Sequence, residues 1–134
     1  MMTWLMVALG SALGGMARYG VGLLVARAVG AAFPWGTLLI NVVGSFVIGF
    51  YGALTLADGA MPASPEARAF VMVGFCGGFT TFSSFSLQTV DLLQAGETVA
   101  AGGYIVGSVA LCVAGAALGY WVASRMGVPV RAAP

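Results

Sequence analysis

The chain has 134 residues, of which 60% are hydrophobic and only 7% are charged, far below the charged fraction of an ordinary soluble domain. Its net charge is +1 and it contains no histidine, which excludes His-based proton relays and His metal sites and gives no indication of a nucleic-acid partner. The sequence contains no acid pair and no nucleotide-binding phosphate loop of the kind that would indicate an enzyme. This composition predicts an integral membrane protein.

The few charged residues divide the chain into four apolar blocks, each long enough to cross a bilayer as a helix. We therefore predict an all-α membrane protein with a single four-span domain over residues 1–134. The expected spans run approximately over residues 3–26, 34–57, 68–92 and 98–124.

The first block carries Gly10, Gly14, Arg18 and Gly22 at intervals of four, and this face is expected to pack closely against protein. Arg18 lies about two thirds of the way along the predicted span. Two interpretations remain open for it: an anchor whose guanidinium reaches the membrane interface, or a cation lining an aqueous vestibule that attracts anions.

The second and fourth blocks each carry a polar stripe on one face. Thr37, Asn41 and Ser45 recur every four residues in the second block, and Tyr104 and Ser108 do so in the fourth, where Cys112 continues the stripe. Such stripes either join helices by hydrogen bonds or line a narrow wet path with donors. The sequence leaves both alternatives open.

The third block is a poor helix in its middle. Gly77-Gly78 and Thr80-Thr81 lower helix propensity within an uncharged run from 69 to 90. A break in lipid leaves backbone groups unpaired unless it faces protein, water or an ion, so we predict a broken helix near Gly77–Thr80 and a candidate ion site. Phe82 and Phe85 follow on one helical face, with Ser83 and Ser84 beside them. Ring edges and hydroxyls can hold a small anion, although the same residues also pack helices.

The basic residues orient the chain only weakly. With four spans, Arg68, Arg125 and Arg131 share one side of the membrane. The other side has Arg27, and also Arg18 if its guanidinium reaches the interface at that end of its helix. The positive-inside rule favours cytoplasmic termini, but a difference this small is compatible with insertion in both orientations.

The sequence resembles the small bacterial fluoride channels of the Fluc (CrcB) family over essentially its whole length. The resemblance rests on 14–19 (GGMARY), on 35–46 (WGTLLINVVGSF) and on Tyr104 and Ser108. Its most specific motif is 74–86 (GFCGGFTTFSSFS) in the third block.

The resemblance implies an antiparallel, dual-topology homodimer with two fluoride pores, working as a passive channel that exports fluoride across the bacterial inner membrane. It also implies a structural sodium ion at the dimer centre, held by main-chain carbonyls of Gly77 and Thr80. The pore residues it implies are Phe82, Phe85, Asn41, Tyr104, Ser108, Thr37, Ser83 and Ser84, with Arg18 in an anion vestibule.

Two departures from the family pattern stand out. Cys112 occupies a place where Ser or Thr is expected, and Gln88 stands where many members have Glu. Two other functions compete with the channel: a non-conducting membrane scaffold subunit, and a small multidrug transporter. The transporter is disfavoured because such proteins depend on an acidic residue within the membrane, whereas the acidic residues here lie at span ends or in loops.

Overall fold

The computed structural model describes residues 1–56 and 58–126. Ala57, at the predicted end of the second span, and residues 127–134, which include Arg131 from the orientation argument, lie outside the described residues. The described residues form helices and turns and contain no strand.

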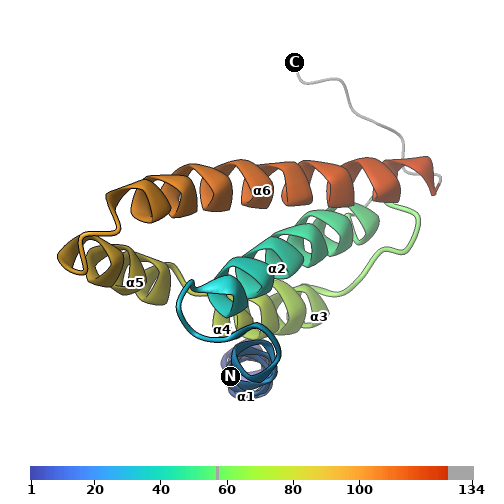
Figure 1. Cartoon of the computed structure of the whole chain (residues 1–134). Helices are drawn as coiled ribbons and strands as arrows, with labels where there is room; N and C mark the ends of the chain where they lie inside the picture. Colours follow the sequence, from blue (N-terminus) through green and yellow to red (C-terminus); the bar gives the residue numbers. More distant parts are fainter. Residues whose placement is uncertain (57, 127–134) are drawn as a thin grey trace.

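Four stretches are long and apolar enough to cross a membrane. The first, second and fourth are single helices, α1 (Met2–Val29), α2 (Trp35–Leu54) and α6 (Thr98–Arg125) (Figure 1). The third, from Pro65 to Gln94, is assembled from four pieces: α3 (Pro65–Arg68), the π-helix η1 (Ala69–Cys76), α4 (Gly77–Phe79) and α5 (Phe82–Gln94). The prediction of an all-α chain with four potential spans is therefore confirmed.

Local chemistry explains where the helices begin and end. Ser64 caps the third stretch, since its hydroxyl accepts a hydrogen bond of 3.2 Å from the Ala67 amide and Pro65 fills the first helical position. Gly30 ends α1 with a φ of 84°, a conformation that glycine adopts without strain. These caps place short turns between long apolar helices.

Helices α2 and α6 lie side by side and form the most extensive helix pair in the chain (Figure 1). Glycines let their backbones approach: a Cβ on Gly49 would lie 2.2 Å from the Ala116 carbonyl oxygen, and one on Gly119 equally close to the Phe46 carbonyl oxygen. In lipid no hydrophobic driving force brings helices together, so helices commonly associate by close packing through small residues.

Arg68 attaches the beginning of the third stretch to the end of α2. Its Nη1 donates to the Gly52 carbonyl oxygen at 3.1 Å and also to the Thr55 hydroxyl. A cation at the carboxyl end of a helix interacts favourably with the helix dipole. One of the residues in the orientation argument thus has protein partners as well as a charge.

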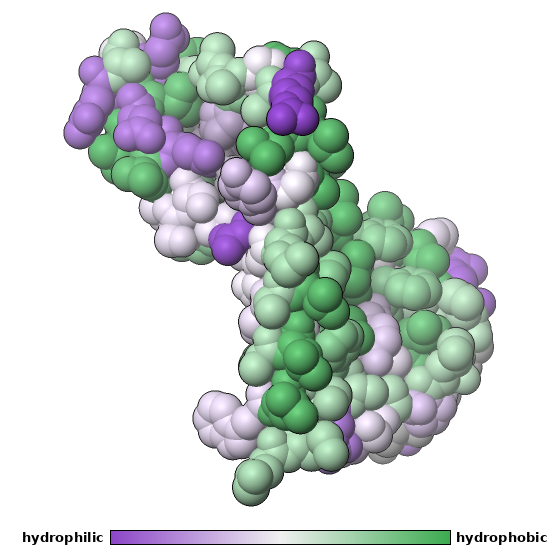
Figure 2. Space-filling model, turned by 90° about the horizontal axis from the view of Figure 1, so that it is seen from below, coloured by the Kyte–Doolittle hydropathy of each residue, from purple (hydrophilic) through white to green (hydrophobic). Residues whose placement is uncertain are grey.

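The outer surface is largely apolar. Figure 2 shows apolar residues along the middle of the face seen from below, with hydrophilic residues gathered toward one end. Large side chains such as Trp4, Leu13 and Val106 are at least half exposed in the single chain. An apolar exterior of this kind suits contact with lipid or with another apolar protein surface.

Helix α1 packs against η1 and α4 through buried Gly10 and Gly14. A Cβ on Gly14 would lie 2.2 Å from the Phe75 carbonyl oxygen and 2.8 Å from the Phe79 amide nitrogen, both backbone atoms that cannot move independently. The predicted contact face of the first span is confirmed for these two glycines.

Gly14→Ala should therefore destabilise the fold, because the added methyl forces α1 away from the third stretch; overpacking of this kind costs about 1–3 kcal/mol. Thermal unfolding of the purified protein in detergent measures the change. Gly15→Ala is the matched control, since a Cβ there meets no atom within 4 Å. An equal unfolding midpoint for both variants would contradict the close packing of α1.

Candidate functional site

The third stretch changes direction at two residues with extended backbone. Thr80 has φ −82° and ψ 159°, and Thr81 has φ −154° and ψ 114°, whereas Gly77 remains helical. Extended backbone suits β-branched threonine. The extended backbone thus falls on the threonine pair, at the C-terminal end of the predicted range Gly77–Thr80. The glycine pair belongs to α4 and is helical.

The Asn41 side chain, from α2, forms hydrogen bonds with both the carbonyl and the amide of Thr81. The Asn41 Nδ2 donates to the Thr81 carbonyl oxygen at 3.0 Å, and the Thr81 amide donates to Asn41 Oδ1 at 2.8 Å. The side-chain amide therefore copies the pairing that a neighbouring strand would offer. The extended segment survives in an apolar setting because its polar groups have these partners.

Thr81 also starts the helix that follows. Its hydroxyl accepts a hydrogen bond of 3.1 Å from the Ser84 amide, as an N-cap does, and lies 3.1 Å from the hydroxyls of Ser83 and Ser84. Thr80 closes the preceding helix, since its hydroxyl donates to the Cys76 carbonyl oxygen at 2.8 Å. Hydroxyls of the pair thus terminate one helix and begin the next.

The break leaves several carbonyls without their usual helical donors, as any helix end does, and those of Gly77 and Thr80 are among them. In a continuous helix the Thr81 amide would bond the Gly77 carbonyl, and the Ser84 amide would bond that of Thr80. Here the first bonds Asn41 and the second bonds the Thr81 hydroxyl. The Gly77 and Thr80 oxygens are therefore suited to accept a hydrogen bond or to ligate a hard cation.

Aromatic rings continue from the break along α5. The ring centroids of Phe82 and Phe85 are 5.2 Å apart, and Phe85 lies 5.0 Å from Tyr104 of α6. Phe82 is 77% exposed in the single chain, whereas Phe85 and Tyr104 are buried. Only one ring of the predicted pair is thus enclosed by this chain.

A cavity of 420 Å³, called the Phe82 cavity, opens beside these rings. Its lining includes the predicted site residues Phe82, Phe85, Asn41, Ser108, Gly77 and Thr80, together with Cys112. The Ser108 hydroxyl is buried and has no hydrogen-bond partner among the described residues. A buried hydroxyl of this kind is costly unless another group or a ligand completes its bonding.

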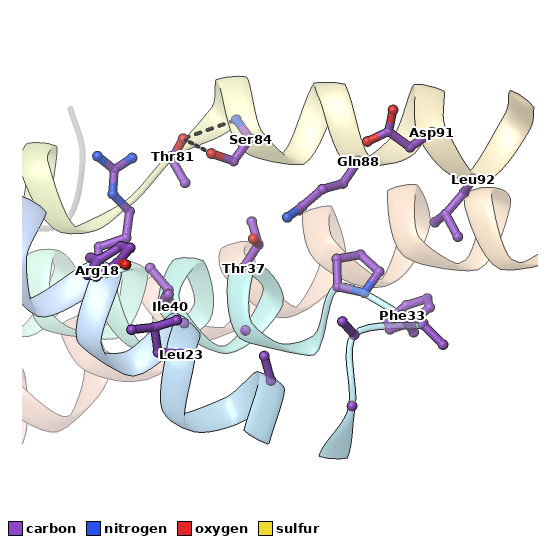
Figure 3. Close-up of a pocket in the computed structure, with 18 of the residues that line it drawn as sticks. Arg18, Leu23, Phe33, Thr37, Ile40, Thr81, Ser84, Gln88, Asp91 and Leu92 are labelled. Atoms are coloured by element: carbon purple, nitrogen blue, oxygen red, sulfur yellow. Dashed lines mark hydrogen bonds between the residues drawn. The ribbon is translucent and has the colours of Figure 1, made fainter. Parts of the chain in front are cut away.

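A second cavity of 810 Å³, called the Arg18 cavity, lies between α1, α2 and α5 (Figure 3). Arg18, Thr37, Thr81 and Ser84 line it, and because Thr81 also lines the Phe82 cavity, both cavities border the break. Arg18 therefore faces a cavity, as the vestibule interpretation requires.

Most lining residues of the Arg18 cavity were absent from the predicted site, among them the polar residues Gln88, Asp91 and Glu97. Helical spacing places Gln88 and Asp91 on the face of Ser84, so the sequence carried a signal for both. Asp91 lies at the opposite end of the cavity from Arg18 in Figure 3, toward the loop after α5. The cavity thus combines one cation with two carboxylates rather than a uniformly positive lining.

Two predicted pore residues line neither cavity. Tyr104 is 1% exposed behind Phe85, and its hydroxyl donates to Gln88 Oε1 at 3.0 Å. Ser83 is exposed at the start of α5, beside the Thr81 hydroxyl. Their roles in a pore stay predictions.

The sequence also matches known proteins. The family model described as CrcB-like protein, Camphor Resistance (CrcB), matches residues 5–120. A protein of Methylocella silvestris named fluoride-specific ion channel FluC is 56% identical over 122 residues, covering 91% of this chain and 93% of that protein. Proteins with the same name from Paramagnetospirillum magneticum and Opitutus terrae are 53% and 52% identical over 124 and 120 residues, covering 97% and 91% of those proteins.

Replacing Asn41 tests whether its side chain holds the break. Asn41→Leu removes both partners of Thr81, and each buried backbone group left unpaired costs about 1–3 kcal/mol. We expect a clear fall in the thermal unfolding midpoint in detergent. Ser45→Ala, which removes a hydroxyl one turn along the same helix and cavity, should change it little. If both variants unfold at the wild-type temperature, the pairing does not stabilise the break.

Proposed function

The chain belongs to the CrcB family, and we propose that it is a passive, fluoride-selective channel. The proposal is supported by matches to relatives named fluoride-specific ion channel over about nine tenths of the chain. The single structural observation that carries it is a helix break that borders two cavities and is lined by hydroxyls, an amide and ring edges. Four apolar helices make the chain a multi-pass membrane protein, and we place it in the bacterial inner membrane.

The residues around the break have the chemistry that fluoride requires. A small, strongly hydrated anion enters a narrow path only if several donors replace its water together. Ser108 offers an unpartnered buried hydroxyl, and Asn41 retains one N–H after its bond to Thr81. The edges of Phe82 and Phe85 add positive electrostatic potential without a formal charge that would hold the ion too tightly. In the Arg18 cavity, the guanidinium raises the local concentration of anions.

The channel works as an antiparallel homodimer with two pores. Phe82 and Gly77 support this proposal because both are exposed in the single chain although they line the Phe82 cavity. A second copy laid against this face would complete the cavity wall and cover the apolar surface. The weak bias of basic residues permits the opposite orientations that such a dimer requires.

A structural sodium ion fits the donor set of the break. The carbonyls of Gly77 and Thr80 have lost their usual helical donors, and hard oxygen ligands suit a hard cation. In a symmetric dimer each copy would contribute the same two oxygens, with Gly77 on the exposed face. Bound there, sodium would supply positive charge that joins the two chains.

Export follows from the membrane potential. Fluoride enters cells as its neutral acid and dissociates inside, and a potential that is negative inside then drives the anion outward through a passive pore. No ATP or proton coupling is needed. Cells gain a lower cytoplasmic fluoride concentration.

Fluoride efflux from proteoliposomes tests the proposed function. With a potassium ionophore for charge balance and a fluoride electrode as detector, the purified chain should release trapped fluoride rapidly and chloride slowly. A scaffold subunit would release neither ion, and a multidrug transporter would show efflux of organic cations coupled to protons. Absence of fluoride efflux from folded protein would contradict the channel.

Phe82→Ile and Phe85→Ile test the aromatic edges. Each substitution keeps an apolar side chain but removes the electropositive ring edge, so fluoride efflux should fall at least about tenfold, equivalent to about 1.4 kcal/mol on the barrier. Phe46→Ile is the control, because Phe46 lines neither cavity. Size-exclusion chromatography checks assembly. Wild-type efflux from both ring variants would assign Phe82 and Phe85 to packing alone.

A further inference from the structure

We infer that Asp91 and Glu97 are specificity-determining residues, whose carboxylates keep divalent oxyanions such as sulfate out of the Arg18 cavity. The inference rests on the proposed function and deepens it, because it names a class of anion that the path excludes before the break. It also gives a use to two negative charges that a path for anions would not otherwise need.

The Arg18 cavity opens at the loop end of the helices. Its lining there includes Glu97 and residues 30–34, which belong to the two connections between helices at this end. Asp91 lies in the last turn of α5. Arg18, in contrast, lies eleven positions before the end of α1 at Val29, which is about 16 Å along the helix axis. An anion that enters from the loop end therefore passes both carboxylates before it reaches the guanidinium.

The charged side chains that line this cavity act on an ion without neutralising one another. Arg18, Asp91 and Glu97 form no ion pair with any other residue of the described part of the chain. Arg27, a further charged residue near this end, is exposed and does not line the cavity. The mouth of the cavity is therefore negative, and its interior is positive.

This order of charges discriminates between anions by their valence. The repulsion between an anion and the two carboxylates is proportional to the charge of the anion, so a divalent anion is repelled twice as strongly as fluoride. Arg18 alone would prefer the divalent ion, because a guanidinium binds oxyanions through paired hydrogen bonds. The carboxylates at the mouth thus prevent sulfate from occupying Arg18 and blocking fluoride.

A variant that combines Asp91→Asn with Glu97→Gln removes both charges and keeps the size of both side chains. At low ionic strength we expect fluoride efflux below saturation to rise about threefold, the order expected for two unit charges about 10 Å from the ion in water. The sulfate concentration that halves fluoride efflux should fall about tenfold, roughly the square of that factor, because sulfate carries two charges. Size-exclusion chromatography checks that the variant assembles as the wild type does.

Glu66→Gln is the matched control, since Glu66 lines neither cavity and its removal changes the net charge by one unit at the other end of the helices. This variant should keep the wild-type response to both anions. Equal factors for fluoride and sulfate in the double variant, or an equal response in Glu66→Gln, would overturn the inference.

Salt dependence separates an electric field from a structural role. At an ionic strength of about 1 M the Debye length is about 3 Å, so the differences between the wild type and the double variant should disappear. Potassium gluconate supplies the ionic strength without a divalent anion. Differences that persist at high salt would show that the substitutions change the shape of the mouth, and would overturn the inference.

Sulfate binding to the purified protein tests the inference apart from conduction. Isothermal titration calorimetry in detergent at low ionic strength should show about tenfold tighter binding to the double variant than to the wild type. Adding Arg18→Gln should abolish the gain. Equal sulfate binding by the wild type and the double variant would overturn the inference even where fluoride efflux is normal. Absence of fluoride efflux from the wild type, together with the expected change in sulfate binding, would instead overturn the proposed function.

Discussion

The pairing of Asn41 with both backbone groups of Thr81 is the interaction on which the site depends. Each unpaired amide or carbonyl in hydrocarbon costs several kcal/mol, so an extended segment inside a span needs partners from elsewhere in the protein. An asparagine amide supplies a donor and an acceptor in one rigid unit. With Thr81 held from α2, its hydroxyl is free to start α5, and both cavities border the place where the helix direction changes.

Small residues bring the break to its partners. A Cβ on Gly44, one turn from Asn41, would lie 2.2 Å from the Thr80 Cγ2, and one on Gly78 would lie 2.5 Å from the Ser11 carbonyl oxygen. Glycine at these places lets α1 and α2 both touch the third stretch. The same close packing leaves Phe82 on the outside of the chain. The single chain thus encloses Phe85 but leaves the ring of Phe82 open.

The sequence predicted what depends on local composition and spacing. Hydropathy located four spans. Glycine and β-branched residues predicted a break near Gly77–Thr80, whereas the glycine pair is helical and the backbone is extended at Thr80 and Thr81. The extended residues lie at Thr80 and Thr81 because the partner that holds them is Asn41, which is 40 positions away in the chain. The contact of Tyr104 with Gln88, and the place of Asp91 in the lining of the Arg18 cavity, likewise depend on how the helices pack against one another. Periodicity assigns a residue to a face, but it does not say what that face meets.

The central claim is that copies of this chain, without any other protein, form a passive path for fluoride through the break. Electrical recording from planar bilayers tests it most directly, because the reversal potential identifies the permeant ion. Under a tenfold fluoride gradient with equal chloride, the current should reverse near the fluoride equilibrium potential, about 59 mV from zero for a univalent ion. Reversal near zero, reversal that follows the proton gradient, or absence of current from folded protein would contradict the account.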